Sequence, residues 1–360
     1  MPQLLLSSKI ALSYPWVKAP FVVGAPMRVM SGAALAVAVS RAGGLGFIGP
    51  SVKTKDMAAD LEEASSIVNG LRGSLAAFHN IQAPVLPIGV GFQLWSDEIE
   101  IAASTIRKFK PCAAWLFAPR NGQRDLDDWS RRIRDASSQT QIWVQIGTVD
   151  EAKRLLREGS VLPDVVVVQG AEAGGHGRAD DGLGLMTLFP EVADVLAPKR
   201  EVLLCAAGGI ADGRGVAAAL CLGASGVVMG TRFLAATEAR IAAGYQGEIV
   251  RATNGAVSTT RTLLYNQLRG TVGWPAGYSP RTIINRSFVE SQEGRPFEEL
   301  QELHDKALKS GDAGWGPEGR LATYAGAAIG LIHEVKDAEA IVHDVQEEVL
   351  RRFALAQNGN

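Results

Sequence analysis

Short, almost entirely apolar runs recur along the first two thirds of the chain, separated by longer stretches in which apolar residues return every three or four positions. Uninterrupted apolar runs are typical of strands buried on both faces of a parallel sheet, whereas the wider spacing is typical of amphipathic helices. The eight runs are residues 20–26, 45–50, 86–92, 113–119, 141–147, 164–170, 201–209 and 225–231. The helical stretches between them are residues 31–42, 55–72, 96–108, 124–136, 149–158, 189–196 and 213–222.

Eight strand-helix units in succession predict an α/β fold, a (β/α)8 TIM barrel, for which about 250 residues is typical. Helix starts are expected at the cap residues Ser31, Ser96 and Asp212. A doubly wound open sheet is the alternative. It ranks second because the first strand ends in Gly24-Ala25-Pro26-Met27 rather than in a GxGxxG turn.

The rhythm changes after Thr231, where glycine, proline and aromatic residues mix and no further buried strand is expected. Residues 237–320 are predicted to form a smaller, mostly helical cap on the substrate side. From Arg320 onward, helical periodicity predicts an eighth outer helix that returns to the barrel. The predicted barrel domain therefore comprises residues 1–236 and 321–360.

Composition narrows the class of protein. The 36 Lys and Arg residues nearly balance 38 Asp and Glu residues, with no long run of either sign, so a nucleic-acid or membrane-surface partner is not expected. Three cysteines without CxxC spacing, and no leader or membrane-spanning stretch, predict a cytoplasmic protein. A homodimer is left open. The 40 glycines are clustered, and the clusters indicate where chemistry lies.

His176 lies in the glycine-rich loop that follows the sixth predicted strand. Loops at the carboxyl ends of barrel strands converge on one mouth, and imidazole titrates near neutrality, so His176 is a candidate general base. Gln169 and Glu172 lie nearby, while Gly174 and Gly175 would allow a ligand to approach the backbone. The alternative is that His176 only forms a hydrogen bond within its loop.

The other histidines have no metal-ligand spacing and are expected at the surface, which predicts no metal site. They are His79, His304, His333 and His343.

The seventh and eighth strands end in glycines, Gly208-Gly209 and Gly230, and Thr231 adds a hydroxyl. Barrels frequently bind phosphate at this pair of loops, and the glycine pattern favours that use over tight turns alone. At the first strand end, Ala25-Pro26-Met27 could wall a flat ring, and Gln145 could donate to a ring carbonyl. Core packing is an equal alternative for each of these.

The motifs at these positions resemble those of the nitronate monooxygenases, formerly called 2-nitropropane dioxygenases. The resemblance spans residues ~20–240 in five motifs, and it extends to PRTIINRSF at 280–288. The five motifs are GAPM at 24–27, AGGLGFIG at 42–49, QGAEAGGHG at 169–177, AAGGIADG at 206–213 and VVMGTRFLAATEA at 227–239.

The resemblance implies a barrel that holds non-covalent FMN, with His176 as the catalytic base. It implies that Ala25, Pro26 and Met27 line the flavin ring and that Gln169 and Gly174 contact it. It places the ribityl phosphate on Gly208, Gly209, Met229, Gly230 and Thr231. Gly91 stands where many bacterial members have an asparagine that contacts flavin, so the chain looks closer to the fungal-type branch. Expected substrate-facing cap residues are Tyr245, Tyr265, Asn266, Trp274 and Tyr278.

The predicted function is oxidation of alkyl nitronates, or of nitroalkanes after deprotonation by His176, to carbonyl compounds and nitrite with O₂. An FMN- and NAD(P)H-dependent enoyl reductase is the nearest alternative, because such enzymes resemble this family and share a GGH-containing loop. A non-catalytic binding protein for flavin or a phosphate ligand is the alternative from another class.

Overall fold

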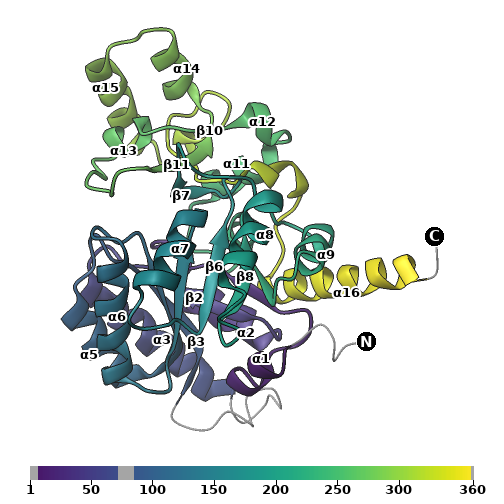
Figure 1. Cartoon of the computed structure of the whole chain (residues 1–360). Helices are drawn as coiled ribbons and strands as arrows, with labels where there is room; N and C mark the ends of the chain where they lie inside the picture. The colour runs from purple at the N-terminus through teal and green to yellow at the C-terminus, as the bar shows by residue number, and fades with distance from the viewer. Residues whose placement is uncertain (1–6, 72–84, 358–360) are drawn as a thin grey trace.

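The computed structural model of the chain describes residues 7–71 and 85–357 (Figure 1). Eight parallel strands close into a barrel in the order β1-β2-β3-β4-β5-β6-β8-β9. They are β1 (Val22–Gly24), β2 (Leu45–Ile48), β3 (Leu86–Gln93), β4 (Pro111–Phe117), β5 (Gln141–Ile146), β6 (Val165–Gln169), β8 (Leu203–Ala207) and β9 (Gly226–Met229). Each predicted apolar run overlaps one of these strands, so the predicted barrel is confirmed and the open sheet is wrong.

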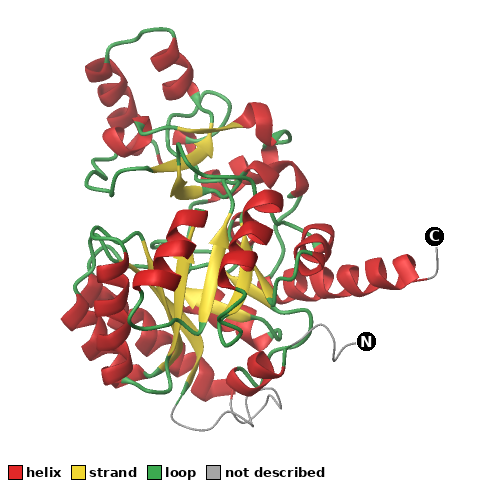
Figure 2. Ribbon diagram, in the orientation of Figure 1, coloured by secondary structure: helices red, strands yellow, loops and turns green. Residues whose placement is uncertain are grey.

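Helices surround the barrel (Figure 2) and overlap the seven predicted stretches. They are α2 (Ala33–Arg41), α3 (Met57–Leu71, after the 3₁₀ turn η2, Thr54–Asp56), α5 (Ile99–Phe109), α6 (Gln123–Ala136), α7 (Val149–Glu158), α8 (Leu185–Leu196) and α9 (Gly213–Cys221). Asp212 caps α9 as predicted, accepting from the N–H groups of Arg214 and Gly215. The predicted caps Ser31 and Ser96 are wrong, since Gly32 and Glu98 hold those positions.

The last helix, α16 (Ala338–Gln357), packs against α2 and α9 on the outside of the barrel. The prediction that it begins near Arg320 is wrong. The chain from 321 to 337 contains only the 3₁₀ turn η4 (Ala327–Leu331) and contacts the loop after β6. A Cβ at Gly326 would lie 2.9 Å from the carbonyl oxygen of Glu172, so this approach requires glycine.

Aromatic side chains fill the barrel interior toward the end opposite the cap, where α1 (Ser8–Ser13) lies (Figure 1). Trp143 stacks on Trp115 and meets Phe47 edge-on, with ring centroids 5.7 and 5.1 Å away. The indole Nε1 of Trp143 donates to the hydroxyl of Tyr14 at 2.8 Å. Among the described residues, this packing fills the barrel interior around Trp143 with side chains.

The segment after β9 contains strands that the sequence analysis did not predict. β10 (Thr259–Arg261) and β11 (Tyr278–Ile283) form an antiparallel sheet whose third strand is β7 (Gly175–Arg178). β7 comes from the loop after β6, so His176 lies in a strand and pairs with Pro280. Proline rarely occupies a central strand because it lacks an N–H, and Pro280 therefore hides this strand in the sequence.

Short helices accompany this sheet: α10 (Thr231–Leu234), α11 (Ala243–Arg251), α12 (Gly255–Ser258), α13 (Leu264–Leu268), α14 (Arg286–Gln292), α15 (Phe297–Leu308) and the 3₁₀ turn η3 (Gly311–Gly314). Figure 1 shows α14 and α15 furthest from α1, beyond β10 and β11, with α13 beside these strands. The division into a barrel and a cap at residues 237 and 320 stays a prediction.

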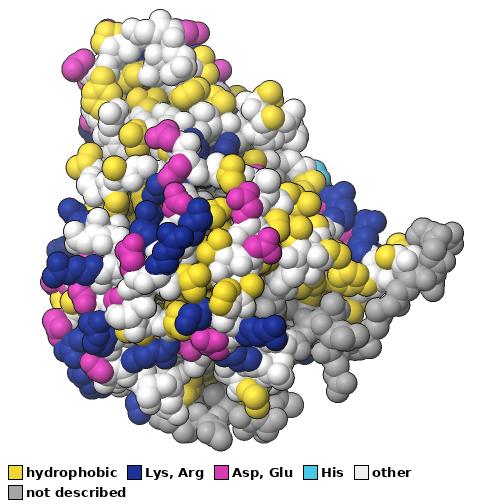
Figure 3. Space-filling model, viewed as in Figure 1, with side chains coloured by type: hydrophobic (Ala, Val, Ile, Leu, Met, Phe, Trp, Pro, Cys, Tyr) yellow, Lys and Arg dark blue, Asp and Glu magenta, His cyan; other side chains and the backbone are white. Residues whose placement is uncertain are grey.

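The face seen in Figure 3 carries basic and acidic side chains close together, with apolar side chains gathered near α8, where Met186 is exposed. Within residues 7–71 and 85–357, none of the helices combines the length and apolar character needed to cross a membrane.

Candidate active site

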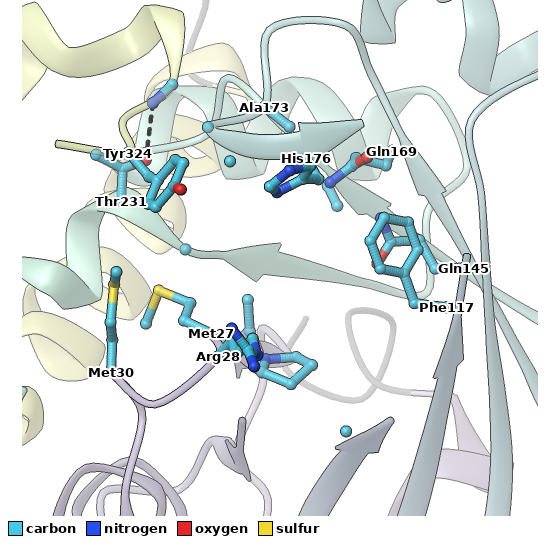
Figure 4. A pocket seen from close by; sticks show the side chains of 18 of the residues that line it. Met27, Arg28, Met30, Phe117, Gln145, Gln169, Ala173, His176, Thr231 and Tyr324 are labelled. Atoms are coloured by element: carbon cyan, nitrogen blue, oxygen red, sulfur yellow. Dashed lines mark hydrogen bonds between the residues drawn. The ribbon is translucent and has the colours of Figure 1, made fainter. Parts of the chain in front are cut away.

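A cavity of about 380 Å³ opens at the carboxyl ends of the barrel strands, between them and the segment after β9 (Figure 4). This is where barrels of this kind place their sites, and the volume is typical of a small-molecule pocket. Fourteen predicted site residues line it: Ala25, Pro26, Met27, Gly91, Gln145, Gln169, Gly174, Gly175, His176, Gly208, Gly209, Gly230, Thr231 and Trp274. Strand ends far apart in the sequence thus meet as predicted.

Five predicted site residues do not line the cavity, and one of them is Asn266, which is 4% exposed in α13. Met229 is fully buried in the core. The hydroxyl of Tyr245 donates to the carbonyl of Tyr324, and that of Tyr265 donates to Oδ1 of Asn285. Tyr278 packs edge-on against Phe117. Each of these tyrosines satisfies its polar end inside the protein, so they are structural in this arrangement.

Other residues line the cavity without having been predicted: Arg28, Trp95, Phe117, Arg269 and Tyr324. Trp95 follows the end of β3, and Phe117 is the last residue of β4, so their positions at strand ends could have identified them. Arg269 and Tyr324 come from the segments after β9, where the sequence gives no comparable signal.

His176 is fixed on two sides. Its Nε2 lies 3.2 Å from Oδ1 of Asn266 in α13. Its ring lies parallel to the indole of Trp274, with centroids 3.6 Å apart and planes 5° apart. Figure 4 shows His176 directed into the cavity, opposite Met27 and Arg28.

The His176 imidazole is neutral at ordinary pH. Burial lowers the pKa of His176 to about 3, which outweighs the hydrogen bond to Oδ1 of Asn266 that favours the charged form. The nearby guanidinium groups of Arg261, Arg269 and Arg28 lower the pKa further. A neutral ring has one free lone pair, which a general base requires.

Two arginines from β10 and β11 hold the loop between β6 and β7. The Nη2 of Arg261 donates to the carbonyls of Ala171 and Ala173 at 3.1 Å each. Its Nη1 donates to Gly175 at 3.2 Å, while Arg281 donates to Ala171 at 3.2 Å. Burial lowers the pKa of Arg261 to about 10, so the group stays charged at neutral pH. The loop that carries His176 is thus tied to β10 and β11.

At one end of the cavity, backbone donors are left free. Gly208 and Gly209 have φ of 93° and 72°, and within the described residues the N–H groups of Gly209 and Gly230 have no hydrogen-bond partner. The hydroxyl oxygen of Thr231 accepts from Gly326 N–H at 3.0 Å, which leaves its proton available to another acceptor. These groups suit an anion such as a phosphate.

Beside this end, Ala25, Pro26 and Met27 form a wall, and Gly91 packs under it. A Cβ at Gly91 would overlap the ring of Pro26, so an asparagine does not fit here without a shift of the wall. Gln145 is oriented by Trp115, whose Nε1 donates to Oε1 of Gln145 at 3.0 Å. The amide NH₂ of Gln145 is then the end free to donate to a ligand.

The remaining histidines are not all at the surface. His304 is 2% exposed in α15, so that expectation was wrong. His333 is exposed and His343 half-buried, whereas His79 lies outside the described residues. Across residues 7–71 and 85–357, no group of three or more His, Cys, Asp or Glu could hold a metal ion.

Comparison with known proteins gives consistent matches. A sequence model of the family described as "Nitronate monooxygenase" matches residues 126–347. Nitronate monooxygenase npaC of Metarhizium robertsii is 55% identical over 339 residues, which cover 94% of this chain and 93% of that protein. A nitronate monooxygenase of Neurospora crassa is 33% identical over 97% of this chain and 94% of its own length. The solved structure of FabK from Thermotoga maritima has a TM-score of 0.73 and 24% identity over 99% of this chain and 100% of its own, a likeness of fold alone.

Proposed function

Because the chain belongs to the nitronate monooxygenase family, we propose that it binds FMN and oxidises alkyl nitronates to carbonyl compounds and nitrite with O₂. Nitroalkanes would enter the same reaction after His176 removes a proton. The family makes the chain an oxidoreductase and a flavoprotein. Membership of the family supports the oxidation of nitronates or nitroalkanes. The proposal adds FMN as the flavin, His176 as the base, and carbonyl compounds and nitrite as the products.

The free backbone donors at one end of the cavity support FMN as the flavin. Gly209, Gly230 and Thr231 would hold the phosphate, since their N–H and O–H groups face an anion with no competing partner among the described residues. A Cβ at Gly230 would meet no protein atom closer than 3.8 Å, so this glycine leaves open space for a ligand. The residues present therefore fit a phosphate-bearing group.

The part of the cavity lined by residues 25–27 and Gln145 also fits the ring of a flavin. Ala25, Pro26 and Met27 would lie against the flavin, and Gln145 would donate through the NH₂ that Trp115 leaves free. When bound, flavin supplies a two-electron acceptor that can return electrons to O₂.

The protein's own part in the reaction centres on His176. A neutral imidazole can take a proton from the carbon beside a nitro group, and the positive charges of Arg28 and Arg269 favour the nitronate anion that results. Burial, with a smaller contribution from these charges, lowers the pKa of His176, which weakens it as a base. The site thus favours a preformed nitronate over a neutral nitroalkane.

The observation that carries this proposal is one cavity that brings together His176, held by Asn266 and Trp274, and the N–H groups of Gly209 and Gly230, which have no hydrogen-bond partner among the described residues.

The test measures bound flavin and oxygen uptake in the wild type and in His176→Asn, with a nitronate and with its parent nitroalkane. We expect FMN in both proteins, nitronate-dependent oxygen uptake in the wild type, and loss of nitroalkane turnover in the variant. Bound FMN without oxygen uptake on any nitronate would refute the monooxygenase. Rapid anaerobic bleaching of the bound flavin by NAD(P)H would instead favour the enoyl reductase. A binding protein would be favoured if neither protein turned over a substrate and both bound the ligand equally well.

A further inference from the structure

The two ring nitrogens of His176 have different surroundings. Nε2 lies 3.2 Å from Oδ1 of Asn266. Nδ1 makes no hydrogen bond within residues 7–71 and 85–357, although the ring lines the cavity. A neutral imidazole carries one proton, so the partner of Nε2 determines which nitrogen keeps its lone pair.

Asn266 is itself held in place. Asn266 is 4% exposed, and its backbone carbonyl accepts from the N–H of Thr271 at 2.9 Å. The hydroxyl of Thr271 makes a long hydrogen bond of 3.5 Å to the same Oδ1 that faces His176. The amide oxygen carries two lone pairs, so Oδ1 can accept from the Thr271 hydroxyl and from an Nε2–H of His176 together.

Burial first, and then the charges around the ring, lower the pKa of His176 and favour the one-proton state. Arg28 from the loop after β1, Arg261 from β10 and Arg269 after α13 all face His176. Tyr324 is the other titratable side chain near the ring, at 6.0 Å between centroids. No carboxylate is among the groups that act on the ring, and within the described residues the hydrogen bond of Nε2 is the one with Asn266.

We infer that Asn266 is a positioning residue that keeps the proton of His176 on Nε2 and thereby makes Nδ1 the atom that accepts the substrate proton. The inference rests on the proposed function for the identity of the substrate. In the step, the C–H bond beside the nitro group breaks, its electron pair stays on the substrate as the nitronate, and the proton forms a bond to Nδ1. The resulting imidazolium still donates Nε2–H to Asn266, which stabilises the charge that develops.

The first test is nitrogen-15 NMR of the imidazole side chains in the purified protein, with the His176 signals assigned by their loss in His176→Asn. The five histidines keep the spectrum tractable. We expect a protonated Nε2 and an unprotonated Nδ1 for His176 at neutral pH. A protonated Nδ1 would overturn the inference, whether or not the protein proves to be a monooxygenase.

The second test uses variants. Asn266→Ala should mix the two tautomers and lower kcat on a nitroalkane about tenfold or more with a smaller change in KM. Asn266→Asp should keep the Nε2–H form, restore part of kcat and move the acid limb of the pH profile upward, because a carboxylate favours imidazolium. Gln267→Ala, an exposed position on the same helix, is the matched control and should behave as wild type. Unchanged tautomer and pH profile in folded Asn266→Ala would contradict the inference.

Discussion

His176 and Trp274 are stacked face to face, with ring centroids 3.6 Å apart, although 97 positions separate them in the chain. Trp274 also contacts Trp95, at 5.0 Å between centroids, so the indole links His176 to the loop after β3. We expect Trp274→Leu to free the imidazole and lower kcat on a nitroalkane about 10- to 100-fold, because small misplacements of a base are costly. Steady-state kinetics would show this, and Trp274→Phe should retain more activity. Equal kcat values for Trp274→Leu and wild type would contradict a role for the stacking.

Gly91 and Pro26 pack so closely that no side chain fits between them. In Gly91→Asn the new Cβ would overlap Pro26, and the wall of residues 25–27 would have to move. We expect a loss of about 1–3 kcal/mol in the free energy of unfolding, typical of overpacking, together with lower flavin content. Thermal melting and flavin absorbance would measure both. Gly70→Asn is the control, since a Cβ there meets no atom within 4 Å.

Gly230 offers a different outcome, because a Cβ there enters the cavity rather than the protein. Its φ of −103° suits any residue. We therefore expect Gly230→Ala to fold with the stability of the flavin-free wild type but to bind FMN at least about tenfold more weakly. Isothermal titration of the flavin-free proteins would test this. Tight FMN binding by the variant would place the phosphate elsewhere.

Arg261 in β10 ties the loop before His176 to β10 and β11 by donating to four backbone carbonyls: those of Ala171, Ala173, Gly175 and Ser279. Arg261→Gln should leave several of these carbonyls unpaired and lower the free energy of unfolding by roughly 3 kcal/mol or more. It should also raise the pKa of His176, because one positive charge is lost. Urea unfolding and an NMR titration would follow the two effects. Lys108→Gln, which removes an exposed ion pair with Glu62 and a contact with the ring of Phe109, should change neither.

The burial of His176 predicts how stability depends on pH. Its pKa is about 3 in the folded protein and near 6.5 in an unfolded chain. Between these values the unfolded chain holds more protons, so the free energy of unfolding falls as pH drops below 6.5, by about 1.4 kcal/mol per unit. Above pH 6.5 the contribution is constant.

His176→Gln should lose this slope, and denaturant unfolding of both proteins at several pH values would measure the difference. His304, whose pKa burial also lowers, is present in both proteins and cancels. Parallel curves for the two proteins would show that His176 titrates normally.

The barrel could be predicted because each strand is an apolar run followed by a helix, and this repeat admits few other folds. His176, Gly209 and Gly230 could be placed for the same reason, since strand ends meet at one mouth. The sequence therefore predicts which residues meet in the cavity when each of them lies at the end of a barrel strand.

The segments after β9 follow no such rule. Tyr265 was expected at the substrate, but its hydroxyl is used inside the protein by Asn285. Arg269 and Tyr324 reach the cavity through contacts that depend on how distant loops pack. β11 was missed because Pro280 lies in its centre. Pairing between β7 and β11 is a long-range choice that local propensity does not reveal.

The shared sheet also constrains how such proteins can be recombined. By chain order His176 belongs to the barrel, but by backbone pairing it belongs with β11, so a crossover near residue 237 would take β7 and β11 from different parents. A hybrid of two relatives must therefore inherit residues 175–178 and 278–283 together to keep the histidine in register. Chain order alone is thus a poor guide to which pieces of this molecule form an exchangeable unit.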